Sequence, residues 1–472
     1  MSVSIDDLFL PAYKQKAALD EGKWTSVELT QAYLDRIDSL NSELAAFVQV
    51  DKDGALAAAK EADRRRQAGE NTPVLGLCGA IKDLIDVGGL KTTYGSRAFA
   101  DNVAEADAPV VARLRAAGAV ILGKVNTTEF ALFSPSMIDG APKNPWDYAR
   151  TAGGSSNGSA TATSAGLCSF AIGTDTAGSI RTPSSFTGIS GLKPTHGRVP
   201  AKGIGELSTY MDTVGPMGRS PQDIALVLQV IAGFDPSDMT SAERPVPDFI
   251  GASQSGVAGM RIGVPESYMP DSLDPEIEAA WRATAVLLRE AGAVVEAVAL
   301  PDTSEAMGIW RGLVVGDALA WHEDSLSERG ELYSEGTRML LEGNASALAV
   351  EVARARKQQW ALRMDYLKAI EGFDAFLLPA APVIAPLDAE IAANSLTSGD
   401  RTVGGEVMLD YAIPFNVTGM PALVMPVGTS AVNGMPLAVM VCASHFGEDR
   451  MFQMATVIET LKPFNTRPER YR

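Results

Sequence analysis

The first clear pattern of apolar positions lies near the N-terminus. Leu29, Tyr33 and Ile37 recur at the spacing of one face of a helix. Thr25 and Glu28 come just before them and have the spacing of a capping box, in which each side chain bonds to the other residue's backbone N–H. The pattern predicts an amphipathic helix that begins after Thr25.

A unit of helix, glycine and buried strand then occurs twice. Residues 107–118 predict a helix that begins around Asp107 and ends at a glycine, and the apolar run 119–123 predicts the strand after it. The same order returns in residues 274–292 and 293–298. Helices and strands in alternation are typical of an α/β layer fold, so we predict the α/β class.

Two further patterns come from the remaining chain. The apolar runs 422–428 and 436–443 flank an Asn-Gly pair, which predicts a β-hairpin. The alanine-rich segments 55–62 and 345–355 predict helices. The pattern contains no internal repeat and no block of like charges.

Composition narrows the range of functions. The chain has 472 residues and a formal net charge of −18, which repels nucleic-acid phosphates and anionic lipid, so neither is an expected partner. The three cysteines lie far apart, which predicts no disulfide framework and no zinc site and fits a reducing cytoplasm. We expect no signal peptide and no membrane span, because the N-terminus lacks the required charged and apolar regions and no apolar run is long enough.

Two stretches of small residues interrupt the apolar pattern. They are TAGGSSNGSA at 151–160 and AIGTDTAGSIRTP at 171–183. Taken alone, the first is also compatible with a flexible linker. Because a helix-like segment and then a buried strand follow it directly, we interpret both stretches as places where the backbone approaches a ligand closely.

The second stretch has the composition that acyl transfer needs. Attack on a carbonyl places negative charge on its oxygen, and converging backbone N–H groups stabilise that charge. Thr176, Ala177 and Gly178 are small enough to allow such an approach, and Ser179 follows them as the candidate nucleophile. A GxSxG match at 154–158 is less suitable, because no strand is predicted before it.

A serine nucleophile needs a base, and the histidines are poor candidates. His196, His322 and His445 all lie outside the small-residue stretches, so we interpret them as structural or surface residues. Lysine can act as the base if burial lowers its pKa, and the candidate is Lys82, which follows the apolar run 77–81. The chain has no nucleotide-binding or zinc-protease motif, and we predict no cofactor and no metal.

Together these segments resemble the amidase signature family. The resemblance is strongest in the serine- and glycine-rich stretch 153–199, and it continues upstream in 80–96 and 107–131. Downstream, residues 373–386 and 414–428 are also similar to the family. The similarity therefore extends over most of the chain and is much more specific than a short motif.

The resemblance implies a catalytic triad of serine, cis-peptide serine and lysine. Carried over by position, Ser179 is the acylated nucleophile, Lys82 is the base, and Ser155, joined to Gly154 by a cis peptide bond, relays the proton. The family's oxyanion donors correspond to backbone N–H groups from Thr176 to Ser179.

Other positions of the motif have supporting roles. Asp175 and Arg181 resemble the pair that holds the nucleophile loop, and Ser156 stands beside the relay serine. Asn157 and Ala177 occupy positions where the family most often has glycine. Asparagine tolerates a positive φ, whereas Ala177 excludes a strongly positive φ inside the donor loop.

The resemblance also predicts the architecture. We expect one domain over residues 1–472, with a mixed, twisted β-sheet covered by helices on both faces. The signature core is expected at about 70–220, and the C-terminal part 257–472 is expected to complete the same sheet and the substrate pocket. Many family members form homodimers, although no interface is identifiable in this sequence.

The predicted activity is the hydrolysis of a small carboxylic amide to an acid and ammonia or an amine. The alternative is a transamidation component like the A subunit of glutamyl-tRNA amidotransferase, which passes ammonia to a partner. The stretch 349–376 lacks the paired tyrosines typical of that protein, and the acidic composition does not favour a tRNA complex. A binding protein that has lost catalysis is a third possibility, but it requires a broken triad.

The substrate itself is not predicted from these patterns. Residues 131–140 and 309–324 are candidate walls of the pocket, although ordinary core packing explains their apolar residues equally well. Trp310 and Trp321 in the second segment favour an apolar or aromatic group in the substrate.

Overall fold

A single mixed sheet of eleven strands organises the protein in the computed structural model, which describes residues 3–266, 272–343 and 349–471. The strand order is β1-β3-β2-β4-β6-β5-β12-β13-β9-β7-β8. The bounds are β1 Phe47–Val50, β2 Cys78–Lys82, β3 Val120–Val125, β4 Phe170–Asp175, β5 Ser190–Lys193, β6 Thr213–Gly218, β7 Arg261–Val264, β8 Val294–Ala297, β9 Ala375–Pro379, β12 Ala422–Thr429 and β13 Pro436–Cys442. The short pair β10 Leu396–Ser398 and β11 Arg401–Val403 lies apart from it.

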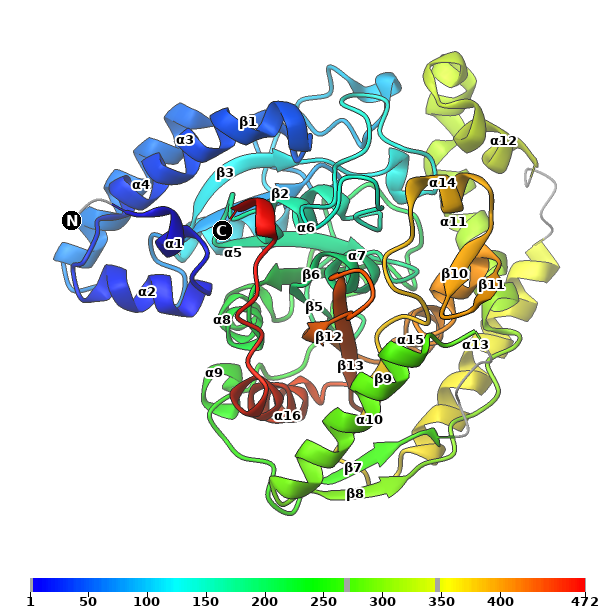
Figure 1. Cartoon of the computed structure of the whole chain (residues 1–472). Helices are drawn as coiled ribbons and strands as arrows, with labels where there is room; N and C mark the ends of the chain where they lie inside the picture. Colours follow the sequence, from blue (N-terminus) through cyan, green and yellow to red (C-terminus); the bar gives the residue numbers. More distant parts are fainter. Residues whose placement is uncertain (1–2, 267–271, 344–348, 472) are drawn as a thin grey trace.

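Helices lie on both sides of this sheet, as predicted (Figure 1). Their bounds are α1 Ile5–Leu8, α2 Ala12–Asp20, α3 Ser26–Leu44, α4 Lys52–Gln67, α5 Pro109–Ala116, α6 Asn157–Ser164, α7 Arg181–Thr187, α8 Pro221–Ile231, α9 Phe249–Ala252, α10 Pro275–Glu290, α11 Ala306–Arg329, α12 Glu335–Gly343, α13 Ala349–Ala369, α14 Asp388–Ala392, α15 Ile413–Thr418 and α16 Glu448–Leu461. Within the described ranges, no helix combines the length and the apolar character that crossing a membrane requires.

Strand β12 shows how the sheet separates two hydrophobic cores. Successive side chains of a strand point to opposite faces. Leu423 and Met425 pack in one core with residues of α3, α8, α10 and α16. Ala422 and Val424 pack in the other core with residues of α11, α13 and α15. The fold is therefore an α/β sandwich of helices around one sheet, to which both the signature core and the C-terminal part contribute strands.

Most elements predicted from the pattern are present. Thr25 caps α3 in a complete capping box, Asp274 caps α10, and β12 and β13 form the antiparallel hairpin. Helix α5 begins at Pro109, two residues after Asp107. Its N-cap residue, Ala108, provides no side-chain cap, and the Asp107 carboxylate accepts a hydrogen bond from the N–H of Gly88. Of the predicted helix 345–355, residues 345–348 lie outside the described residues, and α13 covers the rest.

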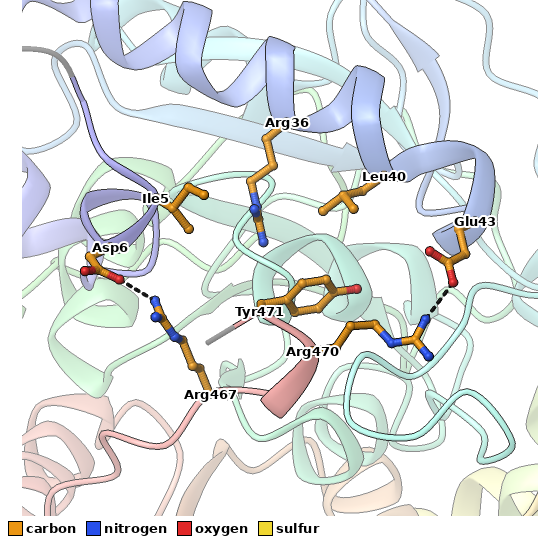
Figure 2. A pocket seen from close by; sticks show the side chains of 8 residues that line it. All are labelled: Ile5, Asp6, Arg36, Leu40, Glu43, Arg467, Arg470 and Tyr471. Atoms are coloured by element: carbon orange, nitrogen blue, oxygen red, sulfur yellow. Dashed lines mark hydrogen bonds and ion pairs between the residues drawn. The ribbon is translucent and has the colours of Figure 1, made fainter.

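The two ends of the chain meet on one side of the molecule. Arg467 pairs with Asp6 at 2.7 Å, and Arg470 pairs with Glu43 at 2.6 Å (Figure 2). These contacts hold the C-terminal segment against α1 and α3 around a cavity of about 710 Å³. Its lining residues all lie outside the two small-residue stretches: Ile5, Asp6, Arg36, Leu40, Glu43, Arg467, Arg470 and Tyr471.

Candidate active site

The predicted catalytic residues lie at one edge of the sheet. Strands β2 and β4 are parallel neighbours, so their carboxyl ends lie at the same edge. Lys82 is the last residue of β2, and Asp175 is the last residue of β4. The loop that carries Ser179 leaves β4 directly and leads into α7. Two segments that are far apart in sequence therefore meet at this point.

Lys82 is completely buried and bonds to two hydroxyl groups. Its Nζ lies 2.7 Å from Ser155 Oγ and 2.8 Å from Thr174 Oγ1. Burial lowers the pKa of Lys82 to about 7, although the negative charges of Asp175 and Asp212 partly oppose that effect. A substantial fraction of this amine is therefore neutral near neutral pH, and a neutral amine can accept a proton.

Ser155 lies two residues before α6, in the turn that leads into that helix within the first small-residue stretch. Its peptide bond with Gly154 is cis, as the resemblance implied. The N–H of Thr128 donates to the Ser155 carbonyl at 3.3 Å. The neighbouring Ser156 exchanges hydrogen bonds with the backbone of Thr174, which attaches this turn to β4.

Ser179 is attached to the same turn through its backbone. The N–H of Ser156 donates to the Ser179 carbonyl oxygen at 3.1 Å, so the two small-residue stretches lie side by side. Among the hydrogen bonds of the described residues, none joins the hydroxyls of Ser155 and Ser179. Hydrogen bonds between catalytic groups often form fully only when substrate is present. The structure thus places Ser179 beside the turn that carries Ser155, without a hydrogen bond between their two hydroxyl groups.

The predicted supporting pair forms a buried network. The guanidinium of Arg181 donates to both carboxylate oxygens of Asp175, at 2.9 and 3.0 Å. Asn416, from α15, donates to the same carboxylate at 2.7 Å. Burial raises the pKa of Asp175, but the charge and hydrogen bonds of Arg181 outweigh it and hold that pKa well below its usual range. Asp175 is therefore a fixed negative charge under the loop.

One predicted oxyanion donor has a different role. The N–H of Gly178 donates to Asp175 Oδ1 at 2.8 Å, so it is not available to a substrate oxygen. Gly178 has a φ of +99°, and a Cβ at this position would lie 2.6 Å from the Cβ of Ala412. This glycine therefore allows the loop to turn back onto Asp175, and the prediction that its N–H stabilises an oxyanion does not fit the geometry.

The other three predicted donor N–H groups are free to bind a substrate oxygen. In the part of the chain that the structure describes, the backbone N–H groups of Thr176, Ala177 and Ser179 meet no hydrogen-bond acceptor. Ala177 does not have a positive φ, so the expected limitation of an alanine here has no consequence. The same holds for Asn157, which is the first residue of α6 and not a left-handed position.

The histidines take no part in this site. His196 and His445 each bond to a backbone carbonyl, and His322 bonds to the Tyr333 hydroxyl. Burial lowers the pKa of all three to about 4. Among the described residues, no group of three or more His, Cys, Asp or Glu side chains is arranged to hold a metal ion.

Sequence reasoning missed two residues of the site. Thr174 bonds to Lys82, and Asn416 bonds to both Asp175 and Arg181. Each is a polar residue inside an otherwise apolar segment, FAIGTD and PFNV, and that signal could have identified them. What the sequence could not supply was the partner of each side chain.

Comparison with known proteins agrees with this geometry. The family model described as Amidase matches residues 28–452. The chain therefore belongs to the amidase signature family, whose members hydrolyse C–N bonds of amides.

Individual relatives cover nearly the whole chain. The A subunit of glutamyl-tRNA(Gln) amidotransferase from Roseiflexus sp. (strain RS-1) is 35% identical over 477 residues, which span 96% of each chain. The solved structure of 6-aminohexanoate cyclic dimer hydrolase complexed with substrate has a TM-score of 0.86 at 27% identity, and the match covers 99% of this chain and 100% of that one. Native peptide amidase from Stenotrophomonas maltophilia has a TM-score of 0.83 at 30% identity, with coverage of 97% and 98%.

Proposed function

We propose that this enzyme hydrolyses a small carboxylic amide through an acyl-enzyme on Ser179, with Lys82 as base and Ser155 as proton relay. The observation that carries the proposal is the buried Lys82–Ser155 hydrogen bond, because burial keeps the amine in a form that can take a proton. A solvated lysine with an ordinary pKa would be protonated and unable to do so.

The proposed reaction begins with two coupled proton transfers. Ser179 gives its hydroxyl proton to Ser155 Oγ while Ser155 gives its own proton to Lys82 Nζ. The Ser179 oxygen attacks the amide carbon, and the carbonyl oxygen becomes an oxyanion facing the free N–H groups of the loop.

The same relay then runs in reverse. Lys82 returns a proton through Ser155 to the amide nitrogen, so the C–N bond breaks and ammonia or an amine leaves. Water attacks the resulting ester, the relay accepts a proton from the water, and Ser179 recovers its hydroxyl when the carboxylic acid is released.

A panel of aliphatic and aryl amides tests this proposal. Release of ammonia or amine identifies substrates, and Ser179→Ala is compared with the wild type on each of them. We expect the variant to lose turnover on every amide that the wild type cleaves. Full turnover by Ser179→Ala on any of them contradicts the proposal.

A second candidate function follows from the curated relatives. Because the similarity to the glutamyl-tRNA(Gln) amidotransferase chain covers 96% of both proteins, a role as the glutaminase part of a transamidating complex is the alternative. The chemistry at Ser179 would be the same, with glutamine as the amide and ammonia passed to a partner protein.

Glutamine distinguishes the two candidates. We expect slow or absent hydrolysis of glutamine and rapid cleavage of at least one simple amide by the purified chain alone. Glutaminase activity that rises on addition of a co-purifying partner, together with no cleavage of simple amides, favours the transamidating role instead.

A further inference from the structure

Thr176, the first residue of the nucleophile loop, is held by two side chains from distant segments. The indole N–H of Trp310, on α11, donates to the Thr176 carbonyl oxygen at 2.9 Å. The Thr176 hydroxyl donates to Asp212 Oδ1 at 2.6 Å. All three residues are buried, so water competes little for these hydrogen bonds.

The bond from Trp310 has a direct effect on the next N–H group. A trans peptide unit is planar, and its C=O and N–H point in opposite directions. The Thr176 carbonyl and the Ala177 N–H belong to one such unit. Because Trp310 fixes the carbonyl, it also fixes the direction of the Ala177 N–H, which is one of the three unpartnered donors.

The N–H groups of Thr176 and Ser179 are oriented in the same way, through hydrogen bonds to the carbonyl of the same peptide unit. The Asp175 carbonyl, which shares a peptide unit with the Thr176 N–H, accepts a hydrogen bond from Asn416 Nδ2 at 3.3 Å. The Gly178 carbonyl, which shares a unit with the Ser179 N–H, accepts from the Thr182 N–H at 2.8 Å. Each free N–H therefore has its peptide plane held from the opposite side.

Asp212 links the side chain of Thr176 to α11, the helix that carries Trp310. Its Oδ2 accepts from the backbone N–H groups of Leu207 and Ser208 at 2.8 and 3.0 Å. The Ser208 hydroxyl in turn donates to Asp317 of α11 at 3.1 Å. Helix α11 thus reaches the loop by two routes, directly through Trp310 and indirectly through Asp212.

We propose that Trp310 and Asp212 are positioning residues that hold Thr176 between them and so aim the Ala177 N–H at the oxyanion. The inference rests on the proposed function of the loop. It gives Trp310 a role that differs from both interpretations of the sequence, a wall of the substrate pocket or ordinary core packing, since its indole N–H acts on the backbone of the loop.

The test compares Trp310→Phe with a matched control, Trp281→Phe. Trp281 is also buried, and its indole N–H donates to the Leu377 carbonyl at 2.9 Å in strand β9. Each variant loses one buried indole–carbonyl hydrogen bond, but only Trp310 contacts the nucleophile loop. The measurements are kcat and KM on an amide that the wild type cleaves, and the second-order rate of labelling by a rhodamine fluorophosphonate. In that reaction the Ser179 oxygen attacks the phosphorus of the probe, an O–P bond forms, and the P–F bond breaks to release fluoride, while the hydroxyl proton passes to the base. Negative charge develops on the P=O oxygen, as it does on the oxygen of an amide.

We expect Trp310→Phe to lower kcat and the labelling rate by about tenfold with KM nearly unchanged, which is less than the 10²–10³ typical for complete removal of an oxyanion donor. The Trp281→Phe rates should stay within about twofold of the wild type. If Trp310→Phe does not fold, β-(3-benzothienyl)alanine at position 310 keeps the bicyclic shape without the N–H. Labelling of Ser179 at the control rate in either 310 variant overturns this inference alone, whereas labelling at another residue overturns the proposed function with it.

Discussion

The Nζ of Lys82 lies 2.7 Å from the Oγ of Ser155, and the lysine side chain has no exposed surface. Two opposing effects set its proton affinity. Burial disfavours the ammonium form, while the carboxylates of Asp175 and Asp212 favour it, and the balance is a pKa of about 7. An amine with that pKa can both take a proton from a hydroxyl and return it within one reaction cycle.

Lys82→Met keeps the length and apolar packing of the side chain and removes the amine. We expect kcat/KM to fall by about 10²–10⁴, the usual contribution of general acid–base catalysis. Progress curves at high enzyme concentration measure the remaining rate.

Lys193→Met is the matched control for this variant. Lys193 is equally buried, burial lowers its pKa to about 7 as well, and its Nζ bonds to the Pro194 carbonyl rather than to a serine. Its kcat/KM should fall by less than about tenfold. Equal losses in the two variants would show that the effect comes from removing a buried amine and not from losing the base.

Asp212→Asn changes the pH dependence in a defined direction. Burial raises the pKa of Asp212 to about 6, so its carboxylate is mostly charged at neutral pH. That charge favours protonated Lys82. Its removal therefore lowers the pKa of Lys82, and the acid limb of the kcat/KM profile should move to lower pH.

The control for this shift is Asp223→Asn. Asp223 is also buried, its pKa is also raised to about 6, and it accepts a hydrogen bond from the N–H of Tyr13, away from the nucleophile loop. Asp223→Asn should lower the free energy of unfolding about as much as Asp212→Asn does. The acid limb of its kcat/KM profile should stay at the wild-type pH. An acid limb that moves to higher pH in Asp212→Asn, or moves equally in both variants, contradicts the electrostatic account.

The sequence predicted the local elements well because their signals are local. The capping box at Thr25 and Glu28 and the hairpin of β12 and β13 depend on residues a few positions apart. The candidate catalytic residues were predicted from a long family motif, and the structure brings two of them, Lys82 and Ser155, into contact.

The remaining parts of the site could not be predicted because they depend on contacts between distant segments. Asn416 and Trp310 come from helices far along the chain, and only the folded sheet brings them to the loop. The role of Gly178 depends on a side chain, because its N–H donates a hydrogen bond to the Asp175 carboxylate. No spacing in the sequence indicates that contact.

Breaking the buried ion pair should reduce stability strongly. Arg181→Met leaves the Asp175 carboxylate buried without its cation, which costs about 3–5 kcal/mol in comparable cases. Urea denaturation measures the free energy of unfolding. Arg64→Ala, which breaks an exposed pair with Glu61, should change that free energy little, because exposed pairs contribute little to stability. Similar losses in the two variants would contradict the importance assigned to the buried network.

Gly178→Ala tests the turn that directs the loop onto Asp175. The new methyl group would lie 2.6 Å from the Cβ of Ala412, so that the two groups would have to move apart. The φ of +99° is also unfavourable for alanine. We expect fluorophosphonate labelling to slow by about 10²-fold, comparable to losing an oxyanion donor.

Gly434→Ala provides the comparison for backbone effects alone. Gly434 has a φ of +72° in the hairpin turn, with nothing within 4 Å of an added Cβ. It should lower the melting temperature slightly and leave labelling unchanged. If Gly178→Ala were labelled as fast as Gly434→Ala, the close packing of the loop would not matter for catalysis.

The pH dependence of kcat/KM between about pH 5 and 9 tests the central claim most directly. Neutral Lys82 is the active form, so kcat/KM should be low in acid, rise with pH through an apparent pKa of about 7, and level off above it. Lys82→Met should lack this limb. A profile that is flat through this range, or a limb that persists unchanged in Lys82→Met, would contradict the claim that a buried, neutral lysine drives the reaction.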